Sequence, residues 1–281
     1  MITVNLMGGT GNQLFQYAMG RALAARGKDV IFSTHELDRD PARMYLLDQM
    51  GLNLRLTKDR GPKPWYGEGS MRYNPAHLEI DNVTMHGYWQ TEKYFLPVRE
   101  EILKEVWNPD YGFYISPKTE EFRNQITSSP NSAFLHVRRS DALSARAVPY
   151  HGVVGLDYYN AAANLIRDTY TDAHFFIFSD DIPWARENFK ADDVTIVDSN
   201  PPSFIVLPDN ELEKVPGGRE VEDLYLMSLC RHGITSNSTF SWWGAWLHET
   251  GLKRTVIAPQ QWFVTKDLDS TDLVPEAWIR L

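Results

Sequence analysis

Short apolar runs alternate with helix-like stripes in two blocks of the chain. In the first block, the apolar run Ile2 to Met7 is followed by glycines and then by apolar residues at helical spacing from Leu14. Gly27 ends this predicted helix, and Val30 to Phe32 has the pattern of a second strand. The first block therefore predicts a βαβ unit.

The second block follows a boundary that we predict at Ser128-Ser129-Pro130-Asn131. Its predicted strands span 133–137, 175–178, 194–197, 233–235 and 255–258, and its predicted helices span 158–167, 184–189, 221–231 and 240–247. This order indicates a parallel sheet with helices on both faces, in which ligands bind beyond the carboxyl ends of the strands.

Two segments are less regular. Residues 59–130 are rich in Pro, Gly and aromatic residues and contain one predicted helix, 98–106. Residues 200–219 carry several prolines and glycines, and a loop of that length is typical of a lid or a mobile linker.

Composition narrows the function classes. The chain has 281 residues, with 28 Lys+Arg against 37 Asp+Glu and a net charge of -9. Non-specific binding to the phosphates of nucleic acid is therefore not expected. An anionic ligand must then be held by a few local positive groups. Cys230 is the single cysteine, which excludes an internal disulfide. The sequence has neither an apolar run of about 20 residues nor a signal-peptide pattern, so we expect a soluble, cytoplasmic protein.

Polar residues follow the first predicted strand. Gly8, Gly9 and Gly11 open a helix whose free N–H groups favour an anion, and Asn12 and Gln13 add amides that suit hydroxyls or phosphate. The spacing is neither the dinucleotide fingerprint nor a P-loop. A purely structural turn is an equally good interpretation.

The strand 133–137 leads into a basic segment. His136 is followed by Arg138 and Arg139, and Asp141 comes next but one. Because successive side chains alternate along an extended segment, one arginine can face a ligand while the other pairs with Asp141 or with the fold. A guanidinium fork suits a diphosphate, although a surface ion pair is the alternative.

Carboxylates follow the strand 175–178. Ser179, Asp180 and Asp181 precede a predicted helix, and an aspartate here can accept hydrogen bonds from guanine or from ribose hydroxyls. A helix cap is the alternative role for one of the two aspartates.

The segment that follows the predicted strand 233–235 has the most polar residues. Asn237, Ser238, Thr239 and Ser241 stand at the start of a helix, which predicts a second phosphate-type site in the same sheet. Each hydroxyl could also be a simple cap. The tryptophans at 242–243 are expected to pack in the core.

Metal and hydrolase chemistry find little support. The eight histidines form no His-Glu-x-x-His pair, the Asp-x-Asp pairs at 38–40 and 267–269 lie in charged loops, and no nucleophile elbow is present. We therefore expect no metal site.

Together these motifs resemble the bacterial α-1,2-fucosyltransferases of glycosyltransferase family eleven. The similarity covers most of the chain, and the motifs keep the order that they have in that family. They are the segments 8–18, 87–90, 94–95, 136–141, 151–152, 158–159, 178–181 and 237–247. The chain departs from the family at Ser140, where glycine is usual, at Ala142, where tyrosine is frequent, and in a longer 200–219 loop.

The resemblance implies an α/β, GT-B-like fold in which two Rossmann-type lobes face a cleft. Residues 1–128 would form an acceptor-side lobe and residues 129–281 a lobe that binds the donor, GDP-β-L-fucose. The implied reaction is inverting transfer of L-fucose to a hydroxyl of a terminal β-galactoside, in an oligosaccharide or surface polysaccharide, with no cofactor and no required metal.

The resemblance also implies roles for single residues. Arg138 and Arg139 would lie at the pyrophosphate, with one of them structural. His136 and the pair Asp180 and Asp181 would contact guanosine. The hydroxyls that would contribute around the diphosphate are those of Ser238, Thr239 and Ser241.

The acceptor side rests on fewer signals. Asp141 or His151 is the candidate base for the acceptor hydroxyl, if a base is needed. Tyr88, Trp89 and Tyr94 could present ring faces to a galactoside, and packing is an equally good interpretation.

Two other functions remain as alternatives. The first is a non-catalytic protein that binds a nucleotide sugar or glycan, which the intact Arg138, Arg139 and Asp141 disfavour. The second is a nicotinamide-dependent oxidoreductase, which the glycine spacing disfavours. No nucleic acid partner is expected, peripheral membrane association stays open, and the oligomeric state is not predicted.

Overall fold

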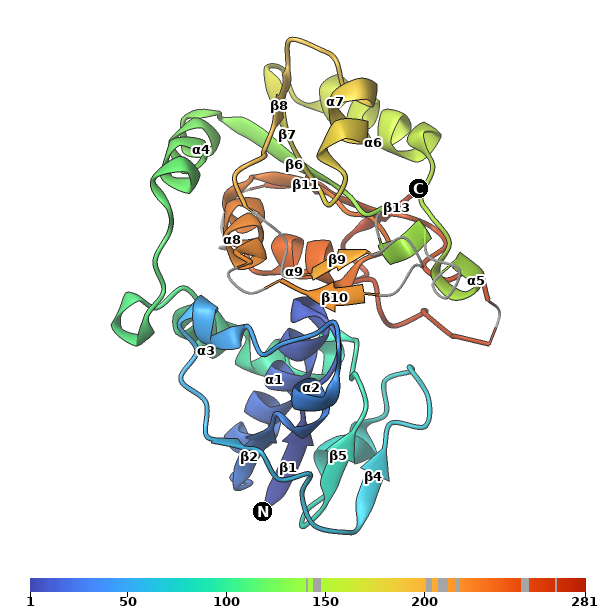
Figure 1. Ribbon diagram of the computed structural model, residues 1–281. Helices are drawn as coiled ribbons and strands as arrows, with labels where there is room; N and C mark the ends of the chain where they lie inside the picture. The colour runs from blue at the N-terminus through green and yellow to red at the C-terminus, as the bar shows by residue number, and fades with distance from the viewer. Residues whose placement is uncertain are drawn as a thin grey trace. The chain divides into compact units, whose positions relative to one another are not determined.

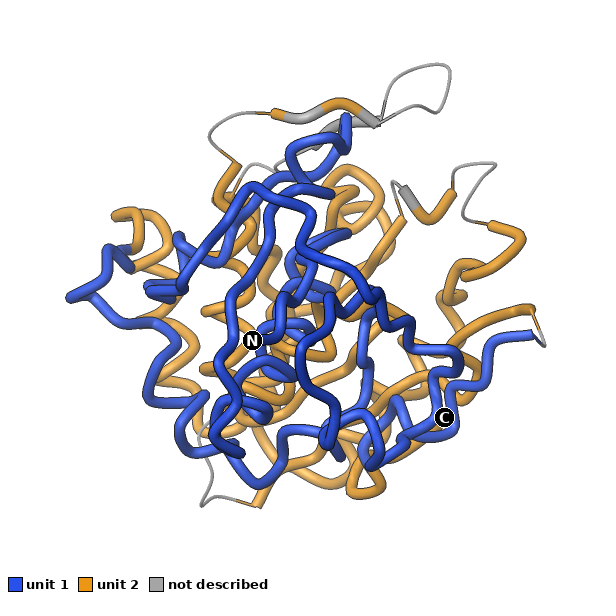
Figure 2. Tube along the Cα trace, turned by 90° about the horizontal axis from the view of Figure 1, so that it is seen from below, with its two compact units in different colours: residues 1–114, 267–275 blue, residues 115–266, 276–281 orange. Residues whose placement is uncertain are grey.

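The computed structural model describes residues 1–139, 141–143, 148–200, 204–206, 212–215, 218–248, 253–265 and 267–281. The chain forms two compact units, which Figure 2 colours separately. Unit 1 comprises Met1–Tyr114 and Asp267–Pro275, and unit 2 comprises Ile115–Lys266 and Glu276–Leu281. The chain thus leaves unit 1 after Tyr114, returns to it near the end of the sequence, and finishes in unit 2.

Unit 1 is built on a parallel sheet of five strands in the order β3-β2-β1-β5-β4 (Figure 1). Its strands are β1 Ile2–Asn5, β2 Val30–Ser33, β3 Leu56–Thr57, β4 Trp65–Gly67 and β5 Thr84–His86. Its helices are α1 Thr10–Ala25, α2 His35–Arg39 and α3 Arg99–Glu105. Its 3-10 segments are η1 Leu47–Met50, η2 Pro75–Leu78, η3 Glu92–Tyr94, η4 Leu96–Val98 and η5 Pro109–Tyr111. The βαβ unit predicted from the sequence is confirmed as β1-α1-β2.

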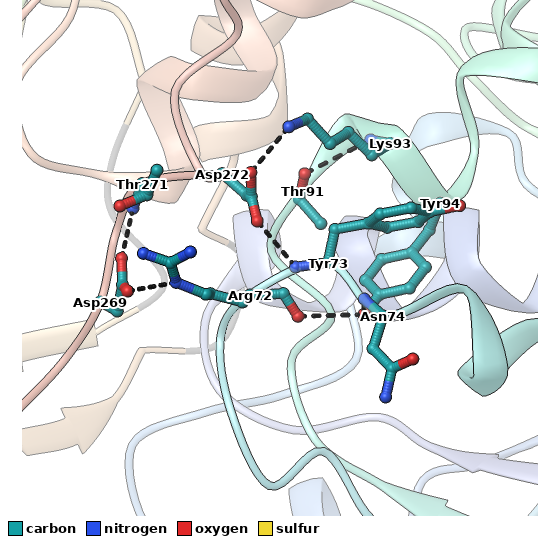
Figure 3. A network of polar contacts seen from close by, with 9 residues as sticks. All are labelled: Arg72, Tyr73, Asn74, Thr91, Lys93, Tyr94, Asp269, Thr271 and Asp272. Atoms are coloured by element: carbon teal, nitrogen blue, oxygen red, sulfur yellow. Dashed lines mark hydrogen bonds and ion pairs between the residues drawn. The ribbon is translucent and has the colours of Figure 1, made fainter.

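The returning segment 267–275 binds unit 1 through a network of polar contacts, drawn in Figure 3. Asp272 accepts a hydrogen bond from the backbone N–H of Tyr73 at 2.9 Å and one from Lys93 Nζ at 2.7 Å. Asp269 pairs with Arg72 at 2.5 Å and accepts from the N–H of Thr271. Because Asp272 joins two separate parts of unit 1, it fixes where this segment runs.

Asp272→Asn is expected to lower the free energy of unfolding by about 1–2 kcal/mol at neutral pH, because it removes a charge-assisted bond to Lys93. Burial raises the pKa of Asp272, but the Lys93 and Tyr73 hydrogen bonds outweigh burial and hold the pKa below its ordinary value. This carboxylate therefore stabilises the fold above the ordinary pKa of aspartate, and the contribution is lost as the pH falls through the lowered value. Chemical unfolding at several pH values should show the variant and wild type converging in acid. A constant difference at all pH values would contradict this account.

Unit 2 is built on a parallel sheet of six strands in the order β13-β12-β11-β6-β7-β8 (Figure 1). Its strands are β6 Asn131–Val137, β7 Ala173–Ser179, β8 Val194–Ile196, β11 His232–Ile234, β12 Val256–Ala258 and β13 Ile279–Arg280. An antiparallel pair, β9 Phe204–Val206 and β10 Leu212–Lys214, lies outside this sheet. Its helices are α4 Pro117–Ser128, α5 Val148–His151, α6 Leu156–Thr169, α7 Ile182–Asn188, α8 Glu220–Leu229 and α9 Thr239–Trp246, with the 3-10 segment η6 Asp141–Leu143.

Both faces of this sheet are apolar, as the continuous apolar strands predict. On one face, Val137 and Ile177 pack with Tyr159 of α6 in one core cluster. On the other face, Phe134 and Phe178 belong to a second cluster with residues of α4, α8 and α9. The predicted α/β class with two Rossmann-type lobes is confirmed, since each unit has its own parallel sheet.

Two features differ from the sequence-based expectation. The predicted boundary lies between residues 128 and 129, whereas the units divide after Tyr114, because Phe122 and Ile126 of α4 pack in the second core cluster of unit 2. The 200–219 segment, predicted as a loop, contains β9 and β10, and its residues 201–203, 207–211 and 216–217 lie outside the described residues. Among the described helices, none is long and apolar enough to cross a membrane.

Candidate functional site

The segments that follow three predicted strands, here called strand exits, meet at one edge of the unit 2 sheet, because β6 lies between β7 and β11. His136 Nδ1 lies 3.0 Å from the hydroxyl of Ser236, which follows β11. The backbone N–H of Arg139, beyond the end of β6, donates to Asp180 after β7 at 2.7 Å. The carboxyl ends of these strands therefore place a histidine, two arginines and two aspartates together, as expected for a parallel sheet.

The side chain of Arg139 contacts residues at the start of α7, beside this edge of the sheet. Its Nε donates to Asp181 at 3.2 Å, and its guanidinium lies 4.2 Å from the centre of the Trp184 ring. Asp181 also caps α7 by accepting from the backbone N–H of Trp184 at 3.1 Å. Arg139 thus has the structural partners that the sequence analysis expected for one arginine of the pair.

Arg138 is the other arginine of the pair. Along β6, Val137 packs on the face that carries Trp184, and Arg139 continues that side of the strand. Alternation carried one residue beyond β6 predicts that Arg138 lies on the opposite side, which is that of His136. This is the side where His136 meets Ser236 and packs against the ring of Phe240.

The start of α9 is organised mainly by its own polar residues. Ser238 caps the helix by accepting from the N–H of Phe240 at 3.3 Å, and the buried Ser241 hydroxyl donates to the carbonyl of Ser238. Thr239 is the first helical residue. The tryptophans at 242–243 are fully buried, as predicted. The hydroxyls of Ser238 and Ser241 thus have local partners at the helix start.

Asn237 has a role that its sequence position did not reveal. Its Nδ2 donates to the carbonyl of His151 at 2.6 Å and to that of Trp262 at 3.2 Å. Both N–H groups of this amide are therefore used within the protein. Asn237 thus positions the loops carrying His151 and Trp262, and its donor contact stays a prediction.

A cavity of about 280 Å³ lies beside this edge. Its polar lining includes His151, Tyr158, Asn237, Gln260 and Gln261. The Tyr158 hydroxyl donates to the carbonyl of Thr235 at 2.8 Å, and burial raises the pKa of this hydroxyl. The ring of His151 packs against Phe263, with centroids 5.4 Å apart. His151 is thus placed at a cavity. The side chain of Asp141 and all of Ser140 lie outside the described residues.

The glycine turn belongs to unit 1, where it leads from β1 into α1. Gly8 has φ +75°, and a Cβ at this position would lie 2.5 Å from Asn12 Nδ2. Gly9 is the extended N-cap residue, and no side chain caps the helix there, while Gly11 lies buried in its first turn. The backbone at this helix start can thus approach a ligand closely.

Gln13 lies just inside α1, with its side chain fully buried. Its Nε2 donates to the carbonyls of Gly8 at 3.0 Å and Met44 at 2.9 Å, and its Oε1 accepts from the N–H of Leu46. These contacts use both N–H groups of the amide. Gln13 thus clamps the turn to the following loop, and its predicted donor-binding role stays a prediction.

The three aromatic residues predicted to bind the acceptor have different environments. Trp89 and Tyr94 are 0% and 1% exposed, and Trp89 packs against Tyr66, His77 and Tyr94. A ring buried on both faces cannot stack on a sugar, so for these two the packing interpretation replaces acceptor binding. Tyr88 is 39% exposed, and its acceptor role stays a prediction.

Glu68 was not identified from the sequence. It follows β4, and its Oε2 and Oε1 accept from the backbone N–H groups of Tyr88 at 2.8 Å and Trp89 at 2.9 Å. No local pattern marks it, because β4 is only three residues long and Glu68 lies 20 and 21 residues before its partners.

The described residues contain no group of three or more His, Cys, Asp or Glu side chains that could hold a metal ion. Asp269, in one of the Asp-x-Asp pairs, is paired with Arg72.

Comparisons with known proteins find relatives of this chain. The family model described as Glycosyl transferase family 11 matches residues 76–281. An alpha-1,2-colitosyltransferase from Escherichia coli is 29% identical, with 100% of this chain and 99% of that protein aligned. The O-antigen biosynthesis glycosyltransferase WbnK from Escherichia coli is 28% identical, with 98% and 99% aligned. Galactoside alpha-(1,2)-fucosyltransferase 2 from Rattus norvegicus is 27% identical, with 88% and 67% aligned.

Among solved structures, POFUT1 in complex with GDP-fucose is similar with a TM-score of 0.44 and 13% identity, covering 92% of this chain and 97% of that one. The family model spans well over half of the sequence and includes all three strand exits of unit 2. The chain is therefore a glycosyltransferase and belongs to glycosyl transferase family 11.

Proposed function

We propose that this glycosyltransferase transfers L-fucose from GDP-β-L-fucose, with inversion, to a hydroxyl of a terminal β-galactoside, and that it needs no metal ion. The observation that carries the proposal is the meeting of three strand exits at one edge of the unit 2 sheet. There, Arg138 and the start of α9 offer positive charge and N–H groups, in a protein of net charge -9.

The chemistry of the leaving group fits such a site. As the bond from C1 to the phosphate oxygen breaks through an oxocarbenium-like state, negative charge grows on the β-phosphate. Fixed donors aimed at that charge stabilise the transition state more than the ground state. Arg138 is the donor that we assign to this task, while Arg139, held by Asp181 and Trp184, keeps the segment in place.

The names of two relatives support two candidates for the donor sugar in this proposal. The rat relative is named for galactoside α-(1,2)-fucosyl transfer, and one Escherichia coli relative is named for α-1,2-colitosyl transfer. Both names include a 1,2 linkage. We therefore propose 2-hydroxyl substitution, with fucose as the donor sugar because the motifs of the chain resemble those of the fucosyltransferases.

Purified protein incubated with GDP-fucose and lactose should release GDP in step with formation of a trisaccharide. NMR of the product should show an α-linked fucose on the 2-oxygen of galactose, because attack opposite the β-linked GDP inverts C1. A parallel reaction with GDP-colitose separates the two donors. Faster turnover of GDP-colitose would overturn the donor assignment and keep the reaction class.

The non-catalytic alternative gives a different result in the same assay. A binding protein would be stabilised by GDP-fucose in a thermal shift but would release no GDP with any galactoside. The proposal that the reaction needs no metal ion is tested by adding EDTA, which should leave the rate unchanged. Loss of activity in EDTA with recovery in manganese would contradict it.

A further inference from the structure

The cavity of about 280 Å³ in unit 2 has no part in the reaction as proposed so far. Its lining lies wholly within that unit and comes from the segments that follow β11 and β12 and from the turn between α5 and α6. Because β11 and β12 are neighbouring parallel strands, the cavity lies at the carboxyl edge of the same sheet that carries the three strand exits. A parallel α/β sheet binds its ligands at this edge.

Contacts between segments that are distant in sequence fix the walls of the cavity. Asn237 Nδ2 donates to the carbonyl of His151 at 2.6 Å, and the N–H of Val264 donates to the carbonyl of Tyr150 at 3.0 Å. Gly152 has φ +64°, and a Cβ there would lie 2.6 Å from Val264 Cγ1, so this close approach requires glycine. The two loops are therefore held together before a ligand binds, which lowers the entropic cost of binding.

The lining is neutral. None of the described residues that form it is Asp, Glu, Lys or Arg. Its apolar part comes from Val153, Val154, Pro259 and Val264. Such a lining does not suit a diphosphate, which needs positive groups, but it does suit a neutral ligand that has both a C–H face and hydroxyl groups.

Gln260 and Gln261 add polar groups that the protein itself does not use. Both side chains are exposed, and within the part of the chain that the structure describes neither amide has a hydrogen-bond partner. The hydroxyl of Tyr158, in contrast, already donates to the carbonyl of Thr235 at 2.8 Å. An amide offers donors and an acceptor together, as a sugar hydroxyl does, so the two glutamines are suited to bind sugar hydroxyls.

The size and position of the cavity fit one sugar ring beside the leaving group. Its volume of about 280 Å³ lies just below the range of about 300–1,000 Å³ that is typical of pockets for drug-sized ligands, so it suits a single ring better than a whole nucleotide sugar. Asn237, in the lining, directly precedes Ser238, the N-cap of the helix whose N–H groups we assign to the diphosphate.

We propose that this cavity binds the galactose ring of the acceptor and that Gln260 and Gln261 recognise its hydroxyls, an inference that rests on the proposed fucosyl transfer. The apolar residues cover the C–H face, and the amides bind hydroxyls that are not attacked. Asn237 is a positioning residue that holds the two loops of the site. This subsite lies in unit 2 together with the donor edge, whereas the family resemblance implies an acceptor-side lobe in residues 1–128.

The double variant Gln260→Ala/Gln261→Ala tests the role of the amides. The KM for methyl β-galactoside should rise about 10- to 100-fold, since each lost hydrogen bond costs about 3- to 10-fold in affinity. The KM for GDP-fucose and the affinity for GDP should stay at wild-type values. Gln125→Ala, an exposed glutamine of the same unit, is the matched control and should change no parameter. A loss of GDP affinity with an unchanged acceptor KM would assign the cavity to the donor and overturn the proposal.

Deoxygenated acceptors show whether the amides contact the sugar directly. Methyl β-galactosides that lack the 3-, 4- or 6-hydroxyl are compared with the parent in wild type and in the double variant. Loss of a hydroxyl that the amides bind should raise the wild-type KM but leave the KM of the variant unchanged, because its partner is already absent. If all three analogues carry the same penalty in both proteins, the amides do not bind the sugar and the proposal is wrong.

A variant that narrows the cavity tests the site without removing a hydrogen bond. Val153→Phe adds bulk to the lining and should raise the acceptor KM at least tenfold, with GDP affinity and melting temperature near wild type. A cavity that holds only water predicts no change. An acceptor KM within twofold of wild type, in this variant or in the double variant, overturns the proposal.

Binding measured without turnover separates this proposal from the proposed function. Saturation-transfer NMR with methyl β-galactoside and GDP should show the bound sugar in wild type and a much weaker signal in the double variant. Wild-type protein that transfers no fucose would refute the proposed function. The subsite is refuted instead if the galactoside signal is absent from wild type or equal in the two proteins.

Discussion

Arg138→Ala is expected to lower kcat for fucosyl transfer by about 100- to 1,000-fold, the usual cost of losing one donor to a developing negative charge. The reason is that the β-phosphate gains charge only as the bond to C1 breaks, so Arg138 acts mostly in the transition state. Arg138 follows β6 and lies outside both core clusters, so the variant should stay folded, and its melting temperature separates a loss of transition-state stabilisation from a loss of folding. Initial rates at saturating GDP-fucose, with melting temperatures of the same samples, measure both effects.

Arg138→Lys refines this prediction. A lysine keeps the charge but not the planar fork that can bind two phosphate oxygens, so part of the loss in kcat should remain. The matched control is Arg139→Lys, which should act mainly on stability, because Arg139 bonds Asp181 and stacks on Trp184. If the Arg139 variant loses more kcat than the Arg138 variant at equal stability, the two assignments must be exchanged.

Gln13→Ala is expected to cost about 3 kcal/mol of unfolding free energy, because it leaves the buried N–H of Leu46 and the half-buried carbonyls of Gly8 and Met44 without this partner. For a protein of this size that corresponds to a fall in melting temperature of roughly 5–10 °C. Turnover should fall as well, since the amide holds the glycine turn at Gly8. Differential scanning calorimetry and steady-state kinetics on one preparation test both effects.

Gln49→Ala serves as the control, because Gln49 is an exposed glutamine of the same unit and its loss should change neither property. The result also decides between two roles for Gln13. A residue that only contacts the donor would lose affinity for GDP-fucose without loss of stability. That outcome would support the donor-binding role and refute the clamp.

The prediction of fold and site succeeded where the signal was local. Long apolar runs marked β1, β6 and β7, and the polar residues just beyond them marked the edge where three exits of unit 2 meet. It failed for β3 to β5, whose two or three residues show no period, and for α4, whose packing partner α8 is distant in sequence. Glu68 was missed for the same reason, since its partners Tyr88 and Trp89 reach it only through the sheet.

The amino-acid sequence by itself determined the α/β class, the family motifs, and the residue types that follow each strand, because periodicity and strand-end chemistry are local properties of the chain. The tertiary structure alone decided which side chains are already committed. Arg139 pairs with Asp181 and lies over the ring of Trp184, and Trp89 packs in an aromatic core. The side-chain amides of Gln13 and Asn237 donate to backbone carbonyls. Hydrogen bonding and burial depend on what packs against a residue, and that is fixed only when distant segments come together.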